Sequence, residues 1–489
     1  MTTPTVLPEL LAWRAERPAT VVLDAQQGQS VATDALARTV ERKARVLVAA
    51  GVRPGDRVAL LVPNSLACVE ALLAVATAGA AAVPVNLRWT APEVDRLLAD
   101  ARPRLLVADA GALARLGALA APPPILDAPL HGGTAHGALP APAPDDTALI
   151  LYTSGTTGRA KGAMLTHRNL LSNAARIASW LGLGPGDRFL TVMPLFHANA
   201  IVLGLMTPLL AGASTVIADR FRADTYWELA ARYRPTTGGT VPTMLALLRD
   251  RPDAPPSAGR ERLRFLLTGS APVPADLLLA AEARLGVPVI EGYGLTECTC
   301  RATFNPIDGR RRLGSCGLPL EPLRIVDPAD QDVTPGAVGE IVLRGPHVMR
   351  GYFDLPEATA HALRGGWLHS GDLARRDAEG FVHVVGRACE LVIRGGENVY
   401  PREIDDVLAA HPDVAEAGAV GVPDARYGEV IWAYVAPRPG ATLDPSAIDR
   451  WCRDRLADYK CPARVVVLAE LPKGPTGKIL KARLPTNGA

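Results

Sequence analysis

Short apolar strands alternate with helical stretches along most of the chain, and this alternation restricts the fold more than any other sequence feature. Apolar runs at 58–63, 81–86 and 104–109 have the length and composition of buried strands. A helical run covers 65–78, and Thr90-Ala-Pro-Glu93 forms a capping box at the start of the next helix. This order predicts an α/β protein with parallel sheets covered by helices.

The pattern changes to α+β near the C-terminus. A strand at 382–387 ends in Gly-Arg, and a helix at 403–410 and further strands follow it. The 489 residues also exceed the ~250–300 that one hydrophobic core usually serves. We therefore expect a large N-terminal domain of layered β-sheets and helices at 1–387, and a small α+β domain at 388–489.

Composition excludes several kinds of partner. The formal net charge of +2 gives no support for binding nucleic acid or a membrane surface. Seven thinly spread cysteines indicate reduced thiols and a cytoplasmic location, and Cys298-Thr-Cys300 has no second pair at zinc-site spacing. No secretory signal is expected. The uncharged stretch 198–218 is interpreted as a buried helix, a turn and a strand rather than a membrane span.

The strongest chemical signal is a buried strand at 149–153 that leads into a loop of glycines, hydroxyls and one lysine, with a helix expected to begin near Thr166. Glycines let backbone N–H groups approach a polyphosphate, and hydroxyls and a lysine add donors and charge. The loop is not a Walker A motif. Its candidate phosphate-binding residues are Thr153, Ser154, Gly155, Thr156, Thr157, Gly158 and Lys161.

Residues 152–162 resemble the phosphate signature of the adenylate-forming superfamily, which includes acyl-CoA synthetases, peptide-synthetase adenylation domains and beetle luciferases. Further motifs at 292–297, 367–372 and 471–478 follow in the family's order. The resemblance implies ATP, Mg²⁺ and coenzyme A as cofactors. It also implies an acid–thiol ligase that forms an acyl-adenylate and then an acyl-CoA, with a mobile C-terminal lid domain.

The resemblance assigns the nucleotide site. It implies that Tyr293 stacks on adenine, Thr296 contacts the α-phosphate, and Glu297 binds magnesium, for which a carboxylate oxygen is suitable. It implies that Asp372 accepts from the ribose hydroxyls, although a Gly-Asp pair alone equally fits a turn. The remaining expected nucleotide contacts are Gly269, Ser270, Ala271, Gly292, Gly294 and Arg387, with Thr157 as the second expected metal ligand.

The last motif contains the expected catalytic lysine. By resemblance, Lys478 holds the substrate carboxylate against the α-phosphate and stabilises charge in the transition state. Lys473 and Lys481 lie nearby, so an exposed tail lysine also fits the pattern. The Pro-x4-Gly-Lys spacing favours Lys478.

Residues 393–401 resemble acyl-CoA synthetases more than peptide-synthetase domains, so coenzyme A is the expected acceptor and a carrier protein the alternative. By resemblance, Gly395 and Gly396 line the pantetheine tunnel and His197 is the gate beside the carboxylate. Arg88 matches a position that meets the coenzyme A 3′-phosphate, and a solvated arginine fits it equally.

The hinge departs from the family pattern, because Cys389 stands where lysine or aspartate is usual. A redox role for this thiol is conceivable, but simple tolerance is favoured, since a hinge needs a permissive backbone more than a given side chain. The departure leaves the efficiency of the second half-reaction open.

The expected acyl pocket is small and apolar, with no cation among its walls, and malonyl-type ligases usually have an arginine where Gly292 stands. We therefore expect the substrate to be a small molecule, a hydrophobic monocarboxylic acid. The expected assembly is a monomer or a homodimer. A luciferase-like oxygenase or a degenerate binding protein would share parts of this pattern, and neither is favoured. The candidate walls are His197, Asn199, Ala200, Ile201, Thr240, Val241, Pro242, Gly269, Gly292, Gly294 and Leu295.

Overall fold

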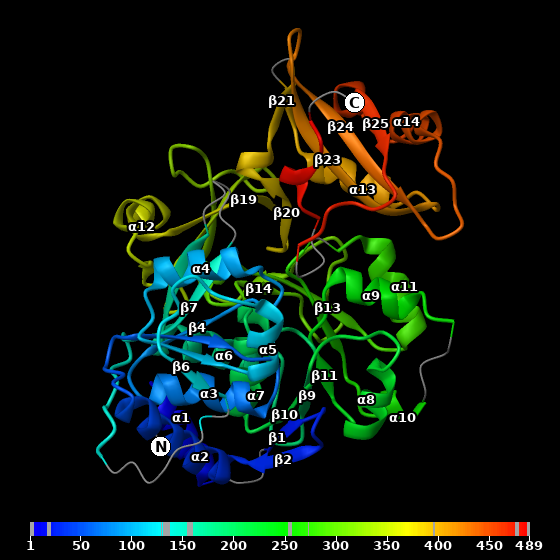
Figure 1. The fold of residues 1–489 in the computed structure, drawn as a ribbon. Coiled ribbons are helices and arrows are strands. Elements are labelled where there is room, and N and C mark those ends of the chain that lie inside the picture. The colour runs from blue at the N-terminus through cyan, green and yellow to red at the C-terminus, as the bar shows by residue number, and fades with distance from the viewer. Residues whose placement is uncertain are drawn as a thin grey trace.

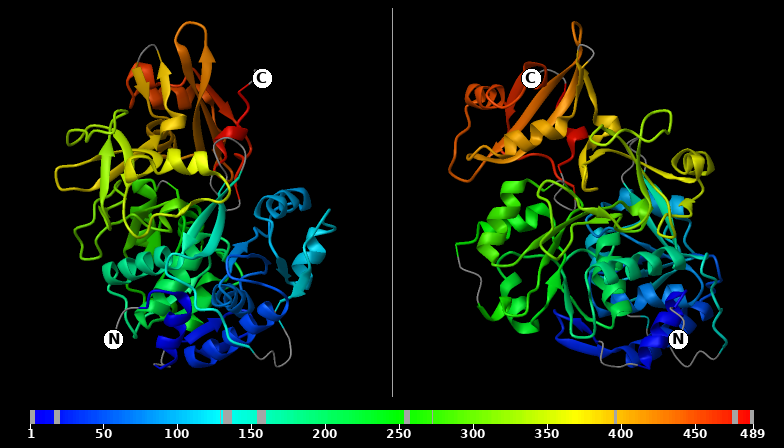
Figure 2. Two further views of the ribbon diagram at one scale, coloured as in Figure 1. Left: turned by 90° about the vertical axis from the view of Figure 1, so that its left-hand side faces the viewer. Right: turned by 180° about the vertical axis from the view of Figure 1, so that it is seen from behind.

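The computed structural model describes residues 4–16, 21–128, 130, 137–153, 160–252, 257–271, 273–394, 397–474 and 479–486. A large body formed by the N-terminal three quarters of the chain carries a smaller C-terminal part above it in Figure 1, and the two rotated views in Figure 2 show the same division. The fold is the expected α/β arrangement of a large N-terminal and a small C-terminal domain.

A seven-stranded sheet lies in the large domain. Its strands, in spatial order, are β18 (Gly351–Tyr352), β8 (Lys161–Thr166), β7 (Thr147–Thr153), β4 (Ala81–Pro84), β3 (Arg57–Leu61), β5 (Leu105–Ala108) and β6 (Ile125–Asp127). The neighbours from β7 to β6 are parallel. The helices predicted between them are confirmed as α3 (Leu66–Thr77) and α4 (Ala91–Ala101). The capping box is also confirmed, since the Thr90 N–H donates to Glu93 Oε2 at 2.8 Å.

Strand β8 was not expected, because the sequence pattern indicated a phosphate loop that leads directly to a helix. The strand pairs antiparallel with β7, and Thr153 lies opposite Lys161. Helix α6 (His167–Trp180) begins only after it. A six-residue strand that starts with lysine and glycine has a weak periodic signal, and pairing with β7 decides its conformation.

Two further sheets continue the large domain. One has the order β11 (Thr237–Gly238), β9 (Arg188–Thr191), β10 (Ser214–Ile217), β1 (Val21–Asp24) and β2 (Gln29–Ala32). The other has the order β12 (Leu266–Thr268), β13 (Val289–Tyr293), β14 (Thr303–Phe304) and β15 (Leu318–Pro319). A parallel bridge between Gly239 and Leu267 brings the end of β11 beside β12. The sheets therefore place the ends of β11, β12 and β13 close together.

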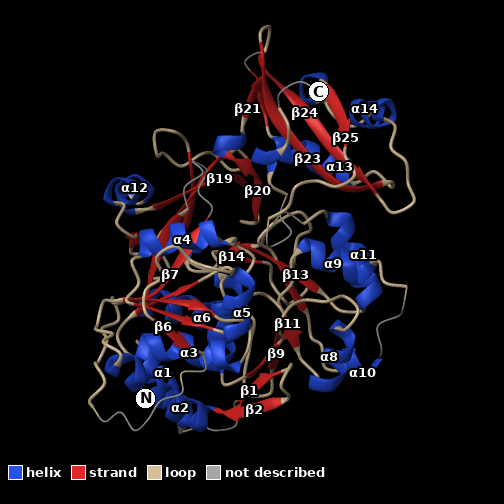
Figure 3. Ribbon diagram, in the orientation of Figure 1, coloured by secondary structure: helices blue, strands red, loops and turns tan. Residues whose placement is uncertain are grey.

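Helices surround these sheets, as Figure 3 shows. The remaining helices of the large domain are α1 (Leu7–Ala15), α2 (Thr33–Ala49), α5 (Ala110–Leu116), α7 (Thr207–Ala211), α8 (Tyr226–Tyr233), α9 (Pro242–Arg249), α10 (Ser257–Arg260), α11 (Ala275–Leu285) and α12 (Pro356–Ala362).

The uncharged stretch 198–218 folds as the sequence predicts. A π-helix, η1 (Asn199–Met206), continues into α7, the chain turns at Gly212, and β10 follows as a fully buried strand. Among the described residues, no helix is both long and apolar enough to cross a membrane. All seven cysteines are free thiols, and Cys389 alone is exposed.

A four-stranded antiparallel sheet precedes the small domain. Its order is β16 (Leu323–Val326), β17 (Gly339–Leu343), β19 (Leu368–Arg376) and β20 (Val382–Arg387). Strand β20 ends at the short helix η4 (Ala388–Glu390), which contains Cys389.

The small domain has its own sheet and its own core. The sheet has the order β22 (Glu397–Val399), β21 (Val392–Arg394), β24 (Gly428–Pro437) and β23 (Val414–Asp424), and β25 (Arg464–Val467) pairs with β24. Helices α13 (Pro401–Ala409) and α14 (Pro445–Arg453) belong to this part. The buried apolar cluster that contains Val392 has no member from the large domain. The expected boundary at residue 387 stays a prediction.

Candidate active site

The two ends of the phosphate loop lie side by side. Thr153 ends β7 and Lys161 begins β8, and the Thr153 hydroxyl Oγ1 lies 3.5 Å from the Lys161 carbonyl oxygen, to which it donates. Ser154, Gly155, Thr156, Thr157 and Gly158, including the expected metal ligand Thr157, lie outside the described residues. The hairpin therefore fixes where the loop starts and where its lysine stands.

Tyr352 joins this lysine to the second motif. The Lys161 ammonium lies 5.1 Å from the centroid of the Tyr352 ring, and the Tyr352 hydroxyl donates to Glu297 Oε1 at 2.9 Å. Burial and the Glu297 carboxylate raise the pKa of Tyr352, so its hydroxyl stays protonated and remains a donor. Sequence reasoning missed Tyr352, which reaches the site only because β18 pairs with β8.

Asp372 contacts expected nucleotide residues from two separate segments of the chain. It faces Arg387 across the β19–β20 pair, with Arg387 Nε 3.1 Å from Asp372 Oδ1. The Tyr293 hydroxyl donates to Asp372 Oδ2 at 2.7 Å. Burial and this carboxylate raise the pKa of Tyr293 well above its usual value. Burial works against the charge of Arg387, but the Asp372 and Glu390 carboxylates raise the pKa of that guanidinium. The 6% exposed Asp372 carboxylate therefore lies between the Tyr293 hydroxyl and the Arg387 guanidinium.

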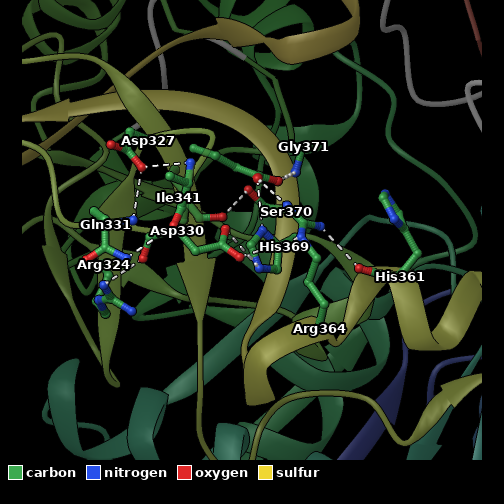
Figure 4. Close-up of polar contacts among 12 residues, drawn as sticks. Arg324, Asp327, Asp330, Gln331, Ile341, His361, Arg364, His369, Ser370 and Gly371 are labelled. Carbon is green, nitrogen blue, oxygen red and sulfur yellow. Dashed lines mark hydrogen bonds and ion pairs between the residues drawn. The ribbon is translucent and has the colours of Figure 1, made fainter.

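A polar network fixes the strand that leads into Asp372 (Figure 4). The Ser370 hydroxyl donates to the Ile341 carbonyl oxygen at 2.7 Å, and the Gly371 N–H donates to Glu340 Oε1 at 2.9 Å. The other oxygen of Glu340 lies 2.9 Å from His369 Nδ1. Since both strands of this pair are tied by side chains, the backbone at Asp372 is positioned independently of the nucleotide.

His197 is held neutral near the start of η1. Burial, with a smaller effect of the nearby Arg88 charge, lowers the pKa of His197 to about 4. Its Nε2 atom is buried and has no hydrogen-bond partner within the described part of the chain. The ring packs against Phe196 with 4.6 Å between centroids. A neutral imidazole with a free nitrogen beside Arg88 fits the place expected for a carboxylate gate.

The glycines of the expected acyl pocket make close backbone approaches. A Cβ at Gly269 would overlap the Gly292 carbonyl oxygen, and a Cβ at Gly294 would overlap the Cys300 carbonyl oxygen. Ser270 follows Gly269, and its hydroxyl Oγ lies 3.5 Å from Asn199 Nδ2. The ends of β12 and β13 and the start of η1 therefore meet at one place.

Three of the expected walls differ in their placement. Val241 precedes α9, next to the Gly239 segment, where a Cβ at Gly239 would lie 3.4 Å from Asn199 Oδ1. Leu295 is partly buried beside the core. Ile201 instead lines a small interior cavity with Leu7, so the structure does not place it with the other walls. Ile201 lies in η1, whose π-helical form the sequence did not predict.

The expectation that no cation stands near these walls is wrong. The Arg301 guanidinium lies beside Gly269, with Nη2 3.1 Å from the position that a Cβ there would take. Arg301 lies between the motif at 292–297 and β14, outside any motif, so no local pattern marks it. The chain's turn after η2 (Thr296–Cys298) brings it to the site.

Glu291 adds a second residue that the sequence did not single out. Burial raises the pKa of its carboxyl to about 8, and Arg402 and Asp406 of α13 are the nearest charges. Arg402 Nε lies 3.0 Å from Asp406 Oδ2, so that guanidinium already has a carboxylate partner. The Glu291 Oε2 atom is buried without a hydrogen-bond partner in the described ranges. The pKa of Glu291, in β13, therefore depends on charged residues of the small domain.

Several expected site residues lie outside or next to the ends of the described ranges. Lys478, Gly395 and Gly396 are not among the described residues. Lys473 and Ile479, which flank the lysine motif, form an antiparallel bridge. Ala271 is described and follows the Gly269 ledge, and Thr296 begins η2.

Comparison with known proteins places the chain in a family. Residues 11–353 match the family model of AMP-binding enzymes, and residues 403–478 match the AMP-binding enzyme C-terminal domain. A sulfoacetate–CoA ligase from Cupriavidus necator is 40% identical over 479 residues, with 95% of this chain and 94% of the relative covered. A feruloyl-CoA synthase from Amycolatopsis is 41% identical over 455 residues, with 92% of each covered. The ATP-bound crystal structure of MatB from Rhodopseudomonas palustris has a TM-score of 0.89 at 33% identity, covering 98% of this chain and 97% of MatB.

Fold and motifs thus define an adenylate-forming enzyme that uses ATP. The chain belongs to the AMP-binding enzyme family, in its acyl-CoA synthetase branch. It is an AMP-forming acid–thiol ligase, and coenzyme A is its acyl acceptor, so these relatives do not favour the carrier-protein alternative.

Proposed function

We propose that this ligase activates a small-molecule carboxylic acid in two half-reactions at the site around Asp372 and Glu297. A carboxylate oxygen attacks the α-phosphorus of ATP and pyrophosphate leaves. The thiol of coenzyme A then attacks the acyl carbonyl, loses its proton and releases AMP. The observation that carries the proposal is the meeting of Tyr293 and Arg387 on the Asp372 carboxylate, because the motifs containing these residues are the ones expected to hold a single nucleotide.

The nucleotide end follows from these contacts. Asp372, which meets Tyr293 and Arg387, is the carboxylate that would accept from both ribose hydroxyls. Lys161 supplies positive charge at the end of the phosphate loop, and Thr296 supplies a hydroxyl for the α-phosphate. No covalent intermediate with the protein is required, so catalysis depends on positioning and charge.

Magnesium fits the donors that are present. Glu297 offers one carboxylate whose Oε1 is oriented by Tyr352, and Mg²⁺ is commonly held by one or two carboxylates together with substrate phosphates. Glu297 and Thr157 would hold the ion, which would neutralise charge on the departing pyrophosphate. No group of three or more possible metal ligands occurs among the described residues.

The coenzyme A end rests on the small domain. Gly395 and Gly396 would line the pantetheine path, and Arg88 would meet the 3′-phosphate. Cys389, exposed in η4, would be the hinge between residues 1–387 and the mobile lid 388–489. A monomer or homodimer remains the expected assembly.

The sequence expectation of a hydrophobic monocarboxylic acid rested on walls without a cation. The relatives do not decide it, since one acts on sulfoacetate and another forms feruloyl-CoA. Because the Arg301 guanidinium lies at Gly269, the proposed substrate is a carboxylic acid that is not restricted to hydrophobic acyl groups.

Replacing Lys478 tests the proposal. Lys478→Ala should reduce pyrophosphate release by on the order of 100-fold or more while leaving ATP affinity within about threefold, because the lysine acts in the transition state. Lys473→Ala is the matched control, since Lys473 is paired with Glu416 and should leave the rate within about twofold. Unchanged turnover in Lys478→Ala would remove this lysine from its proposed role.

A further inference from the structure

Arg301 is a fully buried arginine, and two of its side-chain nitrogens have no acceptor among the described residues. It is 2% exposed and is the largest of the fully buried side chains. Its Nε and Nη2 atoms have no hydrogen-bond partner, and no carboxylate pairs with it in the described part of the chain. Its guanidinium carbon lies 5.4 Å from the centroid of the Phe304 ring, which is its one cation–π contact there.

Such an arrangement is costly for the protein alone. Arginine remains protonated at every accessible pH, so burial cannot be relieved by losing the charge. A buried charge without a partner costs several kcal/mol, and native proteins rarely keep one. Arg188 also has a buried Nε without a partner, but its Nη1 donates to the Tyr233 carbonyl oxygen at 2.5 Å. The unpartnered donors of Arg301 therefore indicate an oxyanion that binds there.

The backbone of Arg301 is fixed so that the side chain cannot easily turn away. The fully buried Asn173 of α6 accepts from the Arg301 N–H at 3.1 Å and donates to the Arg301 carbonyl oxygen at 2.8 Å. A side-chain amide thus clamps both polar groups of this residue. The buried guanidinium is therefore carried by a backbone that is held in place.

The guanidinium points to the acyl side of the site. Its Nη2 and Cζ lie 3.1 and 3.3 Å from the position of a Cβ at Gly269, which also faces the Gly292 carbonyl oxygen. Ser270 connects this ledge to Asn199, two residues beyond the neutral His197. The site would therefore have a cation at the Gly269 wall and an uncharged histidine at the gate, so that the two ends of a bound acid would meet different groups.

We propose that Arg301 binds a second oxyanion on the acyl group, so that the substrate is a small acid carrying a further carboxylate or sulfonate. This inference rests on the proposed function, because it concerns the same acyl site. The planar guanidinium offers parallel N–H donors that match either oxyanion. The reacting carboxylate lies toward His197 and the α-phosphate, and the second anion lies against Arg301.

Matched acids test this assignment directly. Malonate, succinate and sulfoacetate are compared with malonamate, succinamate and methylsulfonylacetate, monoanionic analogues whose second end is neutral, using pyrophosphate release and acyl-CoA formation. For at least one pair, kcat/KM should favour the dianion by on the order of 100-fold, because a buried charge left unpaired penalises the monoanionic analogue. Carboxylate and sulfonate pairs together identify which oxyanion is used.

Two substitutions separate recognition from packing. Arg301→Met keeps length and apolar contact but removes the charge, and it should abolish the preference for the dianion while KM for ATP stays within about twofold. Arg301→Lys should retain part of the preference, because the charge remains and the fork is lost. Arg188→Met is the matched control, a half-buried structural arginine whose loss should lower thermal stability without changing the ratio.

The outcomes are distinct. A wild-type enzyme that prefers the monoanionic analogues or hydrophobic monocarboxylic acids would overturn the role of Arg301 and leave the ligase intact. The same holds if Arg301→Met slows every acid equally, or if it raises KM for ATP and leaves the acid preference unchanged. Absence of acyl-AMP and acyl-CoA with every acid would overturn the proposed function and this inference together.

Discussion

Replacing Glu291 with glutamine should remove a pH dependence from the stability of the folded chain. Burial raises the pKa of Glu291 to about 8 from an ordinary value of 4.5. Between these values the folded state holds a proton that the unfolded state has lost. The free energy of unfolding must therefore fall as pH rises from about 4.5 to about 8, and level off above.

The size of the effect follows from the same shift. At about 1.4 kcal/mol per pKa unit, the full shift corresponds to an upper limit of about 5 kcal/mol. Relaxation and water entry reduce such penalties, so a loss of about 1–3 kcal/mol is expected. The charges that face Glu291 are Arg402 and Asp406 from α13, and the Cys316 thiol is also near. Because Arg402 is already paired with Asp406, the ionised Glu291 gains little from it.

Guanidinium denaturation at pH 5, 7 and 9 measures this effect as the difference between wild type and Glu291→Gln. Glutamine resembles the protonated carboxyl, so the variant should gain relative to wild type as pH rises. Glu9→Gln is a matched control, because the Thr5 N–H lowers the pKa of Glu9 and its contribution is constant above pH 5. A wild-type-to-variant difference that stays constant across this range would refute the reasoning.

Two further predictions concern single contacts. Tyr352→Phe removes the hydroxyl that orients Glu297 Oε1 and should raise the magnesium concentration needed for half-maximal pyrophosphate release by about 3–10-fold, with folding unchanged; an unaltered magnesium titration would exclude an orienting role. Lys43→Met leaves the buried Glu70 without the ammonium that lies 2.5 Å away and should cost about 3–5 kcal/mol of unfolding free energy. The double variant Lys43→Met/Glu70→Leu should recover most of that loss, and no recovery would show that the pair itself is not responsible.

Much of the fold could be predicted because its signals are local. The strands and helices between residues 58 and 109 have periodicities and caps that need no tertiary partner, and the change of pattern after 382–387 marks the small domain. Strand β8 and the π-helical form of the helix η1 were not predicted. Their conformations depend on pairing with β7 and on packing in the core, which leave little trace in a short window.

The site divides in the same way. Motifs bring Thr153, Lys161, Tyr293, Glu297 and Asp372 to attention through glycines, hydroxyls and charges at fixed spacings. The contacts among them depend on strands distant in sequence, as when Asp372 receives Tyr293 and Arg387.

The sequence by itself determined the chemistry of the chain, since phosphate, ribose and lysine motifs occur in an order that defines adenylate formation. Only the tertiary structure decided what surrounds that chemistry. Tyr352, Glu291 and Arg301 carry no motif, and their roles arise from sheet pairing, domain contact and burial. Burial is a property of the whole fold. An arginine buried without a partner is costly, and a bound anion would reduce that cost.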